Sequence, residues 1–161
     1  MPVELPTLWL VIVNVAAWLF IHMAAAWLGT QLPVELFRPG QWCYRERSWE
    51  LGGRLYEVVF AVRRWKGLLP DGAALFKKGF RKKRFNARDS AYMSRFVKET
   101  CRGEAVHWAV LAGSPVFLLW NPWWAGVIMV AYALAANLPC IITQRYNRLR
   151  LTRLIDRARK E

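Results

Sequence analysis

The sequence predicts an all-α polytopic membrane protein with three transmembrane helices, a basic cytoplasmic segment that carries interfacial amphipathic helices, and a basic tail. Two observations predict this fold class. The 161-residue chain is 55% hydrophobic and contains ten tryptophans, yet its formal net charge is +13, a combination that conflicts with a soluble globule. The hydrophobic residues also lie in blocks, and the longest block, residues 105–144, holds no Asp, Glu, Lys or Arg. The length suits a single membrane domain, residues 1–161.

Residues 8–28 form the first predicted span. This stretch is uncharged and 21 residues long, and about 20 apolar residues are needed to cross the hydrocarbon core. A secretory signal peptide is the alternative interpretation, but the preceding residues contain Glu4 and no Lys or Arg. Because a signal peptide needs positive charge before its apolar region, we favour a membrane span.

The forty-residue uncharged block is long enough to cross the bilayer twice. We expect spans at about residues 104–119 and 125–143, joined by a tight, tryptophan-rich outer hairpin. Pro139 is expected to break the second of these helices, because proline removes a backbone donor and crowds the preceding turn. Two crossings return the chain to the face from which it started, so the two ends of the block should lie close together.

Basic residues are concentrated in two segments. Residues 29–104 contain 17 Lys or Arg against eight Asp or Glu, and residues 145–161 contain seven Lys or Arg against two Asp or Glu. Residues 1–28 contain no Lys or Arg. Positive loops stay in the cytoplasm, which predicts a multi-pass protein of the cell membrane with its amino terminus outside. The segment 29–103 and the tail, including the carboxyl terminus, are then cytoplasmic. Because this charge lies beside membrane spans, anionic headgroups are its expected partner, and we expect no nucleic acid.

The cytoplasmic segment contains two candidate interfacial elements. Residues 53–66 show apolar positions at helical spacing with basic residues between them. This pattern is typical of a helix in the membrane interface, and equally of an amphipathic helix packed on protein. The basic cluster 77–88 could bind the phosphates of CoA or of lipids, although a solvated face against headgroups is the simpler interpretation. Residues 90–100 predict a helix that runs toward Glu104.

Glu104 and His107 are the first catalytic candidates. Residues three apart share a helix face, and a carboxylate there can fix the tautomer of an imidazole and raise its basicity. Acyl transfer needs such a general base. The alternative is a glutamate at a helix end beside an interfacial histidine, but ionisable groups in spans are costly and usually functional.

Cys101, Glu104 and His107 also invite a metal interpretation. Three ligands on one short helix fit a tetrahedral site poorly, and diiron bundles use two copies of the E-x-x-H motif where this chain has one. We therefore predict no metal. Three widely spaced cysteines do not form a disulfide framework.

Residues 144–148, Gln-Arg-Tyr-Asn-Arg, form the densest polar cluster. Gln144, Asn147 and Arg148 fall on one helical face and could donate hydrogen bonds to an oxyanion or to phosphate oxygens. Anchoring of a span by positive residues is the alternative, and it explains the arginines but not the amides. Asn137 lies about two turns earlier on nearly the same face, which makes it a candidate pocket residue.

These features resemble the glycosyl-4,4'-diaponeurosporenoate acyltransferase family of staphyloxanthin-type carotenoid biosynthesis. Q-R-Y-N-R at the end of a last span, some forty residues after E-x-x-H-W, is a specific combination. The matching stretches run through most of the chain: Leu28-Gly29-Thr30, Phe37-Arg38, Trp65-Lys66, Asp71-Gly72, Glu99-Thr100, Arg102, Glu104, His107-Trp108, Pro115, Tyr132-Ala133, Ala136-Asn137, Pro139, Gln144-Arg145-Tyr146-Asn147-Arg148 and Arg150-Leu151.

The resemblance implies transfer of a fatty acyl chain to a sugar hydroxyl of a glycosylated carotenoid, or of another glycolipid in a distant relative. Membrane lipids, an acyl thioester donor such as acyl-CoA and the glycosylated acceptor are then its partners, and no further cofactor is expected. The motif positions imply His107 and Glu104 as catalytic residues. They imply as substrate-binding residues Arg102, Asn137, Gln144, Arg145, Asn147 and Arg148.

The chain departs from one acyltransferase pattern. The H-x-x-x-x-D motif of soluble acyltransferases is absent, because the fifth residue after His107 is Ala112, so Glu104 is the expected partner of the base. Two other functions stay open on the residues alone. One is a different membrane lipid-modifying enzyme, by methyl transfer or with a metal, and the other is a non-catalytic assembly partner of envelope or carotenoid enzymes.

Overall fold

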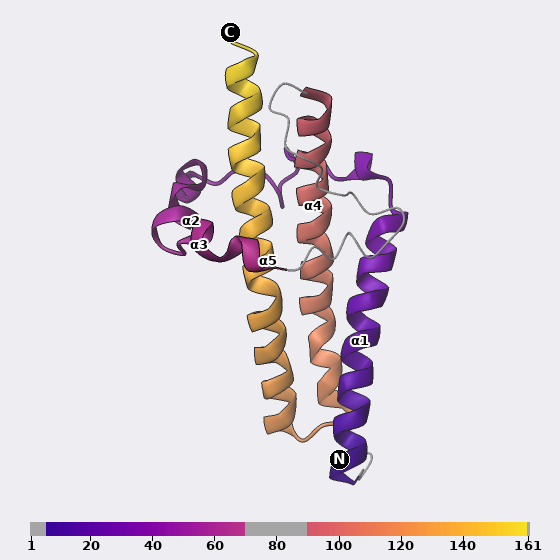
Figure 1. Ribbon diagram of the computed structural model, residues 1–161. Coiled ribbons are helices and arrows are strands. Elements are labelled where there is room, and N and C mark those ends of the chain that lie inside the picture. The colour runs from indigo at the N-terminus through magenta and orange to yellow at the C-terminus, as the bar shows by residue number, and fades with distance from the viewer. Residues whose placement is uncertain (1–5, 70–89, 161) are drawn as a thin grey trace.

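The computed structural model describes residues 6–69 and 90–160, and every regular element in these ranges is helical, which confirms the all-α prediction. Three long helices form a bundle: α1 (Thr7–Gln31), α4 (Ser90–Gly113) and α5 (Trp123–Ala158). Helices α1 and α5 run in the same direction and α4 runs against them (Figure 1). The described amino-terminal end and the α4–α5 connection therefore lie at one end of the bundle, and the carboxyl terminus lies at the other.

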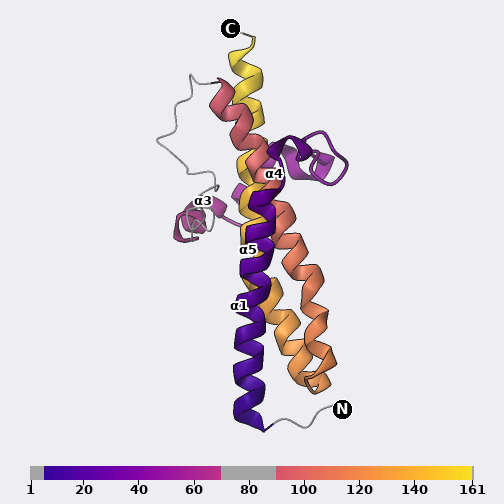
Figure 2. The ribbon, with the colours of Figure 1, turned by 90° about the vertical axis from the view of Figure 1, so that its right-hand side faces the viewer.

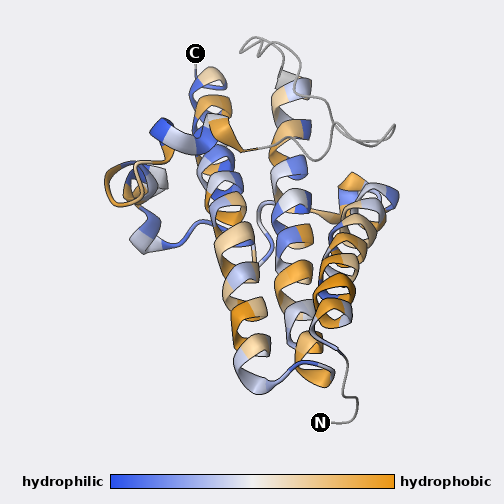
Figure 3. Cartoon of the chain, turned by 60° about the horizontal axis from the view of Figure 1, so that its bottom comes forward, coloured by the Kyte–Doolittle hydropathy of each residue, from blue (hydrophilic) through white to orange (hydrophobic). Residues whose placement is uncertain are grey.

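Two described helices, α1 and α5, are long and apolar enough to cross a membrane, each with a mean hydropathy of 2.0 over its most apolar window. The remaining expected span, residues 104–119, is divided between the end of α4 and a 3-10 helix, Ser114–Leu119, with Pro115 in its first turn. Apolar residues dominate the end of the bundle that holds the α4–α5 connection, whereas hydrophilic residues gather toward the carboxyl terminus (Figure 3).

Helix α1 packs mainly along α4 (Figure 1 and Figure 2), and its Trp18 also reaches Met129 and Ala133 of α5. The Trp18 indole stacks on Phe117 with ring centroids 4.5 Å apart, and Val110 and Ala133 complete this core. The backbones approach closely at Gly29, where an added Cβ would meet Val106 of α4. Small residues permit such close helix packing in membrane proteins.

A buried amide pair joins α1 to the α4–α5 connection. Asn14 and Asn121 exchange side-chain hydrogen bonds of 2.9 and 2.8 Å, and Trp120 Nε1 donates to Asn14 Oδ1 at 2.8 Å. Buried amides must be paired to offset the cost of leaving water. Asn14 is therefore a packing contact between α1 and the α4–α5 connection.

The expected break at Pro139 is wrong: α5 is continuous from Trp123 to Ala158, with Pro139 inside it. Proline removes only one backbone donor, and neighbouring helices can hold the axis in place when they pack on both sides of the lost bond. Asn137, two residues earlier, returns its side-chain Nδ2 to the carbonyl of Ala133 at 2.9 Å. The expected third span and the basic tail are thus parts of one continuous helix.

Residues 32–69, the wrapping segment, follow α1 and form short elements that lie against the carboxyl-terminal half of α5 and against α4. These are the 3-10 helices Val34–Leu36, Ser48–Gly53 and Lys66–Leu68, and the short helices α2 (Arg54–Val58) and α3 (Val62–Trp65). The single helix expected over 53–66 is divided because Ala61 adopts a left-handed φ of 46°. Tyr56 and Val62 pack on Tyr146 and Leu149, which supports packing on protein for this face. The basic cluster 77–88 lies outside the described residues.

Candidate active site at the α4–α5 contact

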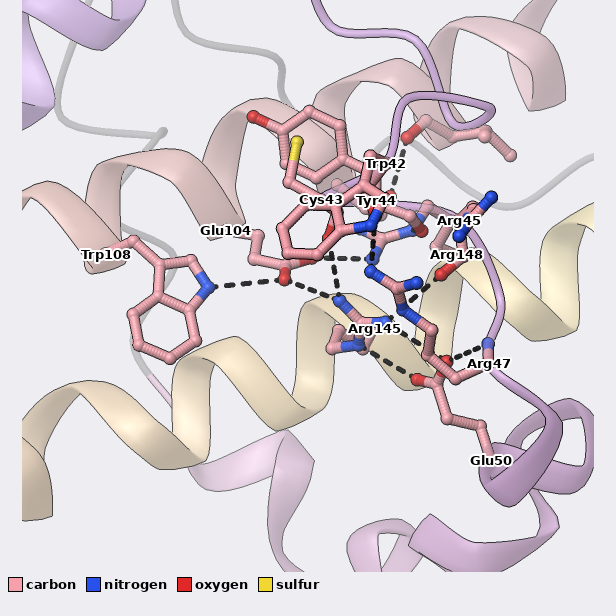
Figure 4. Close-up of polar contacts among 12 residues, drawn as sticks. Trp42, Cys43, Tyr44, Arg45, Arg47, Glu50, Glu104, Trp108, Arg145 and Arg148 are labelled. Atoms are coloured by element: carbon pink, nitrogen blue, oxygen red, sulfur yellow. Dashed lines mark hydrogen bonds and ion pairs between the residues drawn. The ribbon is translucent and has the colours of Figure 1, made fainter.

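The two ends of the uncharged block meet in a buried ion-pair cluster. Glu104 of α4 is 1% exposed. Its Oε1 accepts a hydrogen bond from Arg145 Nη1 at 2.9 Å, and its Oε2 accepts one from Arg148 Nη2 at 2.6 Å. Figure 4 shows Glu104 between the Trp108 indole and the Arg145 guanidinium. The expected approach of these two chain segments is confirmed.

Arg145 uses its whole guanidinium group within the protein. Its Nε and Nη2 donate to the two oxygens of Glu50 at 2.9 and 3.0 Å. Nη1 and Nη2 also donate to the backbone carbonyls of Cys43 and Arg45 at 3.1 and 3.3 Å. A guanidinium group has five N–H donors, and these contacts together with Glu104 occupy all of them. Arg145 therefore holds residues 43–50 against α4 and α5.

Burial and charge act in opposite directions on Glu50, which is 0% exposed. Burial alone raises its pKa, but hydrogen bonds from Arg145 and from the Tyr56 hydroxyl, at 2.6 Å, outweigh burial, so the pKa lies below its usual range. Burial is the main cause that raises the pKa of Tyr56, and its hydrogen bond to Glu50 raises this pKa further. The cluster thus contains two carboxylates and two guanidinium groups, which balance each other in charge. Breaking such a buried pair leaves an uncompensated charge.

The other residues of the 144–148 cluster mostly hold the wrapping segment. The Tyr146 hydroxyl donates to Glu57 at 2.8 Å and accepts from Arg63 at 3.0 Å. Asn147 Oδ1 accepts from Lys66 Nζ at 3.2 Å. Arg148 Nε donates to the carbonyl of Tyr44 at 3.1 Å.

Gln144 is placed differently, against α4. A Cβ added to Gly103 would lie 2.9 Å from Gln144 Nε2, so the amide lies directly on the backbone of α4. The described contacts give this amide no hydrogen bond. Gln144 therefore keeps its donors available on the same side of α5 as Asn137, and Arg148 Nη1 is a buried donor of the same cluster that also has no hydrogen-bond partner.

His107 is bonded to Asn137 of α5 rather than to Glu104. Its Nδ1 lies 2.8 Å from Asn137 Oδ1, and Asn137 is 1% exposed. Because the Asn137 Nδ2 is engaged with Ala133, the oxygen faces the imidazole, and an oxygen only accepts. The proton therefore sits on Nδ1, and Nε2 presents its lone pair. Glu104 is drawn away because charge-assisted bonds to two arginines are stronger than a bond to neutral imidazole.

The remaining candidates on α4 lie apart from this pair. Arg102 is 8% exposed and forms an ion pair of 2.5 Å with Glu99. Cys101 is fully buried, and burial raises the pKa of its thiol to about 11, so it stays protonated. Within the described ranges, no three His, Cys, Asp or Glu side chains are grouped as metal ligands.

A cavity of about 590 Å³ opens beside Glu104. Three tryptophans, Trp42, Trp49 and Trp108, line it together with Arg47, Glu104 and Arg145. Sequence reasoning missed this cavity, the tryptophans and Glu50. A signal for Glu50 exists, since it is an acid in an arginine-rich segment, flanked by Trp49 and Leu51. Its partner Arg145 lies 95 positions later, which no local spacing reveals.

Comparison with known proteins identifies the family. The family model described as glycosyl-4,4'-diaponeurosporenoate acyltransferase matches residues 40–157. The chain belongs to this family. A relative of that name from Staphylococcus aureus strain bovine RF122 is 33% identical over 138 residues, covering 86% of this chain and 83% of the relative. The namesakes from strains USA300 and NCTC 8325 are 32% identical over the same shares. No solved structure matches the chain.

The family assignment makes the protein an acyltransferase and confirms the resemblance read from the motifs. The matched part of this acyltransferase contains the ion-pair cluster, the His107–Asn137 pair and the cavity, because these lie between Trp42 and Arg148. Helix α1 precedes the matched part.

Proposed function

We propose that the protein moves a fatty acyl chain from a thioester donor to a sugar hydroxyl of a glycosylated carotenoid or glycolipid at the inner leaflet. The names of the relatives support a glycosylated carotenoid as the acceptor. The observation that carries the chemistry is the 2.8 Å bond between His107 Nδ1 and Asn137 Oδ1. This bond leaves the other imidazole nitrogen as a base.

The reaction needs one proton to move twice. His107 Nε2 takes the proton from the sugar hydroxyl as the hydroxyl oxygen attacks the thioester carbonyl, and a C–O bond forms. When the intermediate collapses, the C–S bond breaks, and the thiolate takes the proton from the imidazolium. The Asn137 oxygen stabilises the imidazolium that exists between these two transfers and holds the ring in one orientation.

The developing oxyanion needs donors that are not already used. Gln144 meets this condition, because its amide lies on Gly103, one turn of α4 before His107. Arg145 and Asn147 are engaged with the wrapping segment, and Arg102 is engaged with Glu99. We assign these residues, with Arg148 and Glu104, to building and holding the substrate-binding site, and Gln144 to the oxyanion.

The placement in the membrane follows from charge and hydropathy. Helices α1 and α5 are long and apolar enough for two crossings, and in this proposal the end of α4 with the 3-10 helix that follows makes a third, shorter one. The basic wrapping segment and tail lie at the end of the bundle that holds the carboxyl terminus (Figure 1). Positive residues favour the cytoplasm, so the amino terminus is outside and the site faces the inner leaflet.

The test compares the two histidines of the chain. Purified His107→Ala protein, assayed with a glycosylated acceptor and an acyl thioester, should lose about 10²–10⁴-fold in kcat, the contribution of a general base. His22→Ala is the matched control, because His22 lies in α1 and bonds the carbonyl of its own helix at Trp18. It should retain turnover within a few-fold. Full turnover by His107→Ala, or equal losses in both variants, would exclude this mechanism.

A further inference from the structure

We propose that the cavity walled by Trp42, Trp49 and Trp108 is the subsite for the sugar ring of the acceptor. The proposal rests on the proposed function for the nature of the acceptor. It adds the place where this protein holds the sugar and the side chains that select it.

The three tryptophans converge on one wall, although their side chains are exposed at the surface of the protein. Trp42 is 72% exposed, Trp49 56% and Trp108 50%, yet all line one cavity. They come from separate segments: Trp49 from the 3-10 helix Ser48–Gly53, Trp108 from α4, and Trp42 from the loop before that 3-10 helix. Aromatic side chains that share a concave wall are the typical lining of a small-ligand site.

The chemistry of the wall fits a pyranose ring. Such a ring has apolar C–H faces and a rim of hydroxyl groups, so it stacks on indoles and needs polar partners at its edge. The cavity, at about 590 Å³, falls within the range of roughly 300–1,000 Å³ typical of small-ligand sites, which combine aromatic walls with a few polar groups. A fatty chain would need no charged group, and this wall contains three.

Arg47 is the polar partner with donors to spare. Its guanidinium lies 4.7 Å from the centre of the Trp42 ring and donates one bond, at 2.7 Å, to the Trp42 carbonyl. Among the described residues, no acceptor bonds to the other side-chain N–H groups of Arg47. Arg145 and Glu104, by contrast, are saturated by each other and by the cluster. We therefore assign Arg47 to the sugar hydroxyl groups.

The subsite and the proposed base lie on neighbouring faces of α4. Glu104, Ala105 and Trp108 line the cavity, and His107 does not. At about 100° per residue, His107 is rotated about 60° from Glu104 and about 100° from Trp108. A sugar ring held on the tryptophans therefore has to extend past Glu104 to bring one of its hydroxyl groups to His107.

The experiment uses Trp42, because its indole is the most open of the three and its backbone bond to Arg47 survives substitution. Trp42→Ala should raise KM for the glycosylated acceptor about tenfold, the loss expected for one aromatic stack. The effect should fall on KM for the acceptor rather than on kcat or on KM for the acyl donor. Trp42→Phe should recover most of the affinity. Trp123→Ala, at another exposed tryptophan, the first residue of α5, is the matched control.

A second readout is independent of turnover. Saturation-transfer NMR with methyl glycosides of common hexoses should detect contact with the wild-type protein and with Trp123→Ala, and much weaker contact with Trp42→Ala. Contact with the glycosides but no acyl transfer would overturn the proposed function and keep the subsite.

Three results would overturn the subsite. The first is acyl transfer with an unchanged acceptor KM in Trp42→Ala. The second is a rise confined to the donor KM, which would place the donor in the cavity. The third is a loss of membrane retention without any change in KM, which would mark the tryptophans as anchors.

Discussion

The two polar groups at the α4–α5 contact differ in how much of their bonding capacity they use. In the cluster of Glu50, Glu104, Arg145 and Arg148, both carboxylates and the whole Arg145 guanidinium are engaged with protein atoms. The histidine one turn along α4 has one nitrogen fixed by an amide and the other left open. The saturated group is suited to hold structure, and the open group is suited to react. Charge density alone is therefore a poor guide to the reacting atom.

The largest expected effect is on the ion-pair cluster. Glu104→Ala leaves two buried arginines without their shared carboxylate, and breaking a buried pair typically costs about 3–5 kcal/mol. Thermal unfolding in detergent should show a strongly lowered Tm, with residues 43–50 becoming sensitive to protease. Glu46→Ala is the control, since Glu46 is about half exposed and its contact with Arg153 is 4.0 Å long. A wild-type Tm for Glu104→Ala with lost turnover would instead place Glu104 in the chemistry.

The next largest effect concerns the bond from His107 Nδ1 to Asn137 Oδ1, which orients the imidazole. Asn137→Ala removes the acceptor for His107 Nδ1, so the imidazole loses its fixed tautomer and part of the roughly 10²–10⁴-fold supplied by a general base. We expect kcat to fall about tenfold or more, with the pH dependence of kcat shifted. Asn137→Asp should retain more turnover than Asn137→Ala, because it keeps an acceptor. Equal kcat in all three proteins would show that this bond only packs the helices.

The smallest effect concerns pH and the saturated cluster. Since the folded-state pKa of Glu50 lies below its usual value, its ionised form contributes stability above the unfolded pKa of about 4.3. That contribution is lost as the pH falls through the folded pKa. Tm should be steady from neutral pH to about 5 and fall below about 4.3. Glu50→Gln should flatten this acid limb, whereas Glu46→Gln, at a half-exposed site, should leave it unchanged.

The sequence predicted correctly the all-helical class and the meeting of the two polar ends of the uncharged block, because both follow from local quantities, whereas only two of the three expected spans are long apolar helices in the described residues. An uncharged block that is long enough for two crossings returns the chain to the side of the membrane from which it started. Glu104 then lies on the helix before the return, and the amides and arginines of 144–148 lie on the helix after it. The break expected at Pro139 did not occur, since packing around a long helix compensates one lost bond. The single helix expected at 53–66 is divided at Ala61, which adopts a left-handed φ, while Tyr56 and Val62 on either side of it pack on α5.

Composition and periodicity act along the chain, so they suffice to predict the helical class, the apolar blocks, the charge asymmetry and the identity of the polar residues that meet. Only the tertiary structure decided which polar residue bonds to which. Glu104 lies three residues from His107, yet its carboxylate belongs to two arginines from α5, and the imidazole belongs to Asn137. The physical reason is competition: a carboxylate chooses the strongest donors within reach, and reach is set by how helices pack.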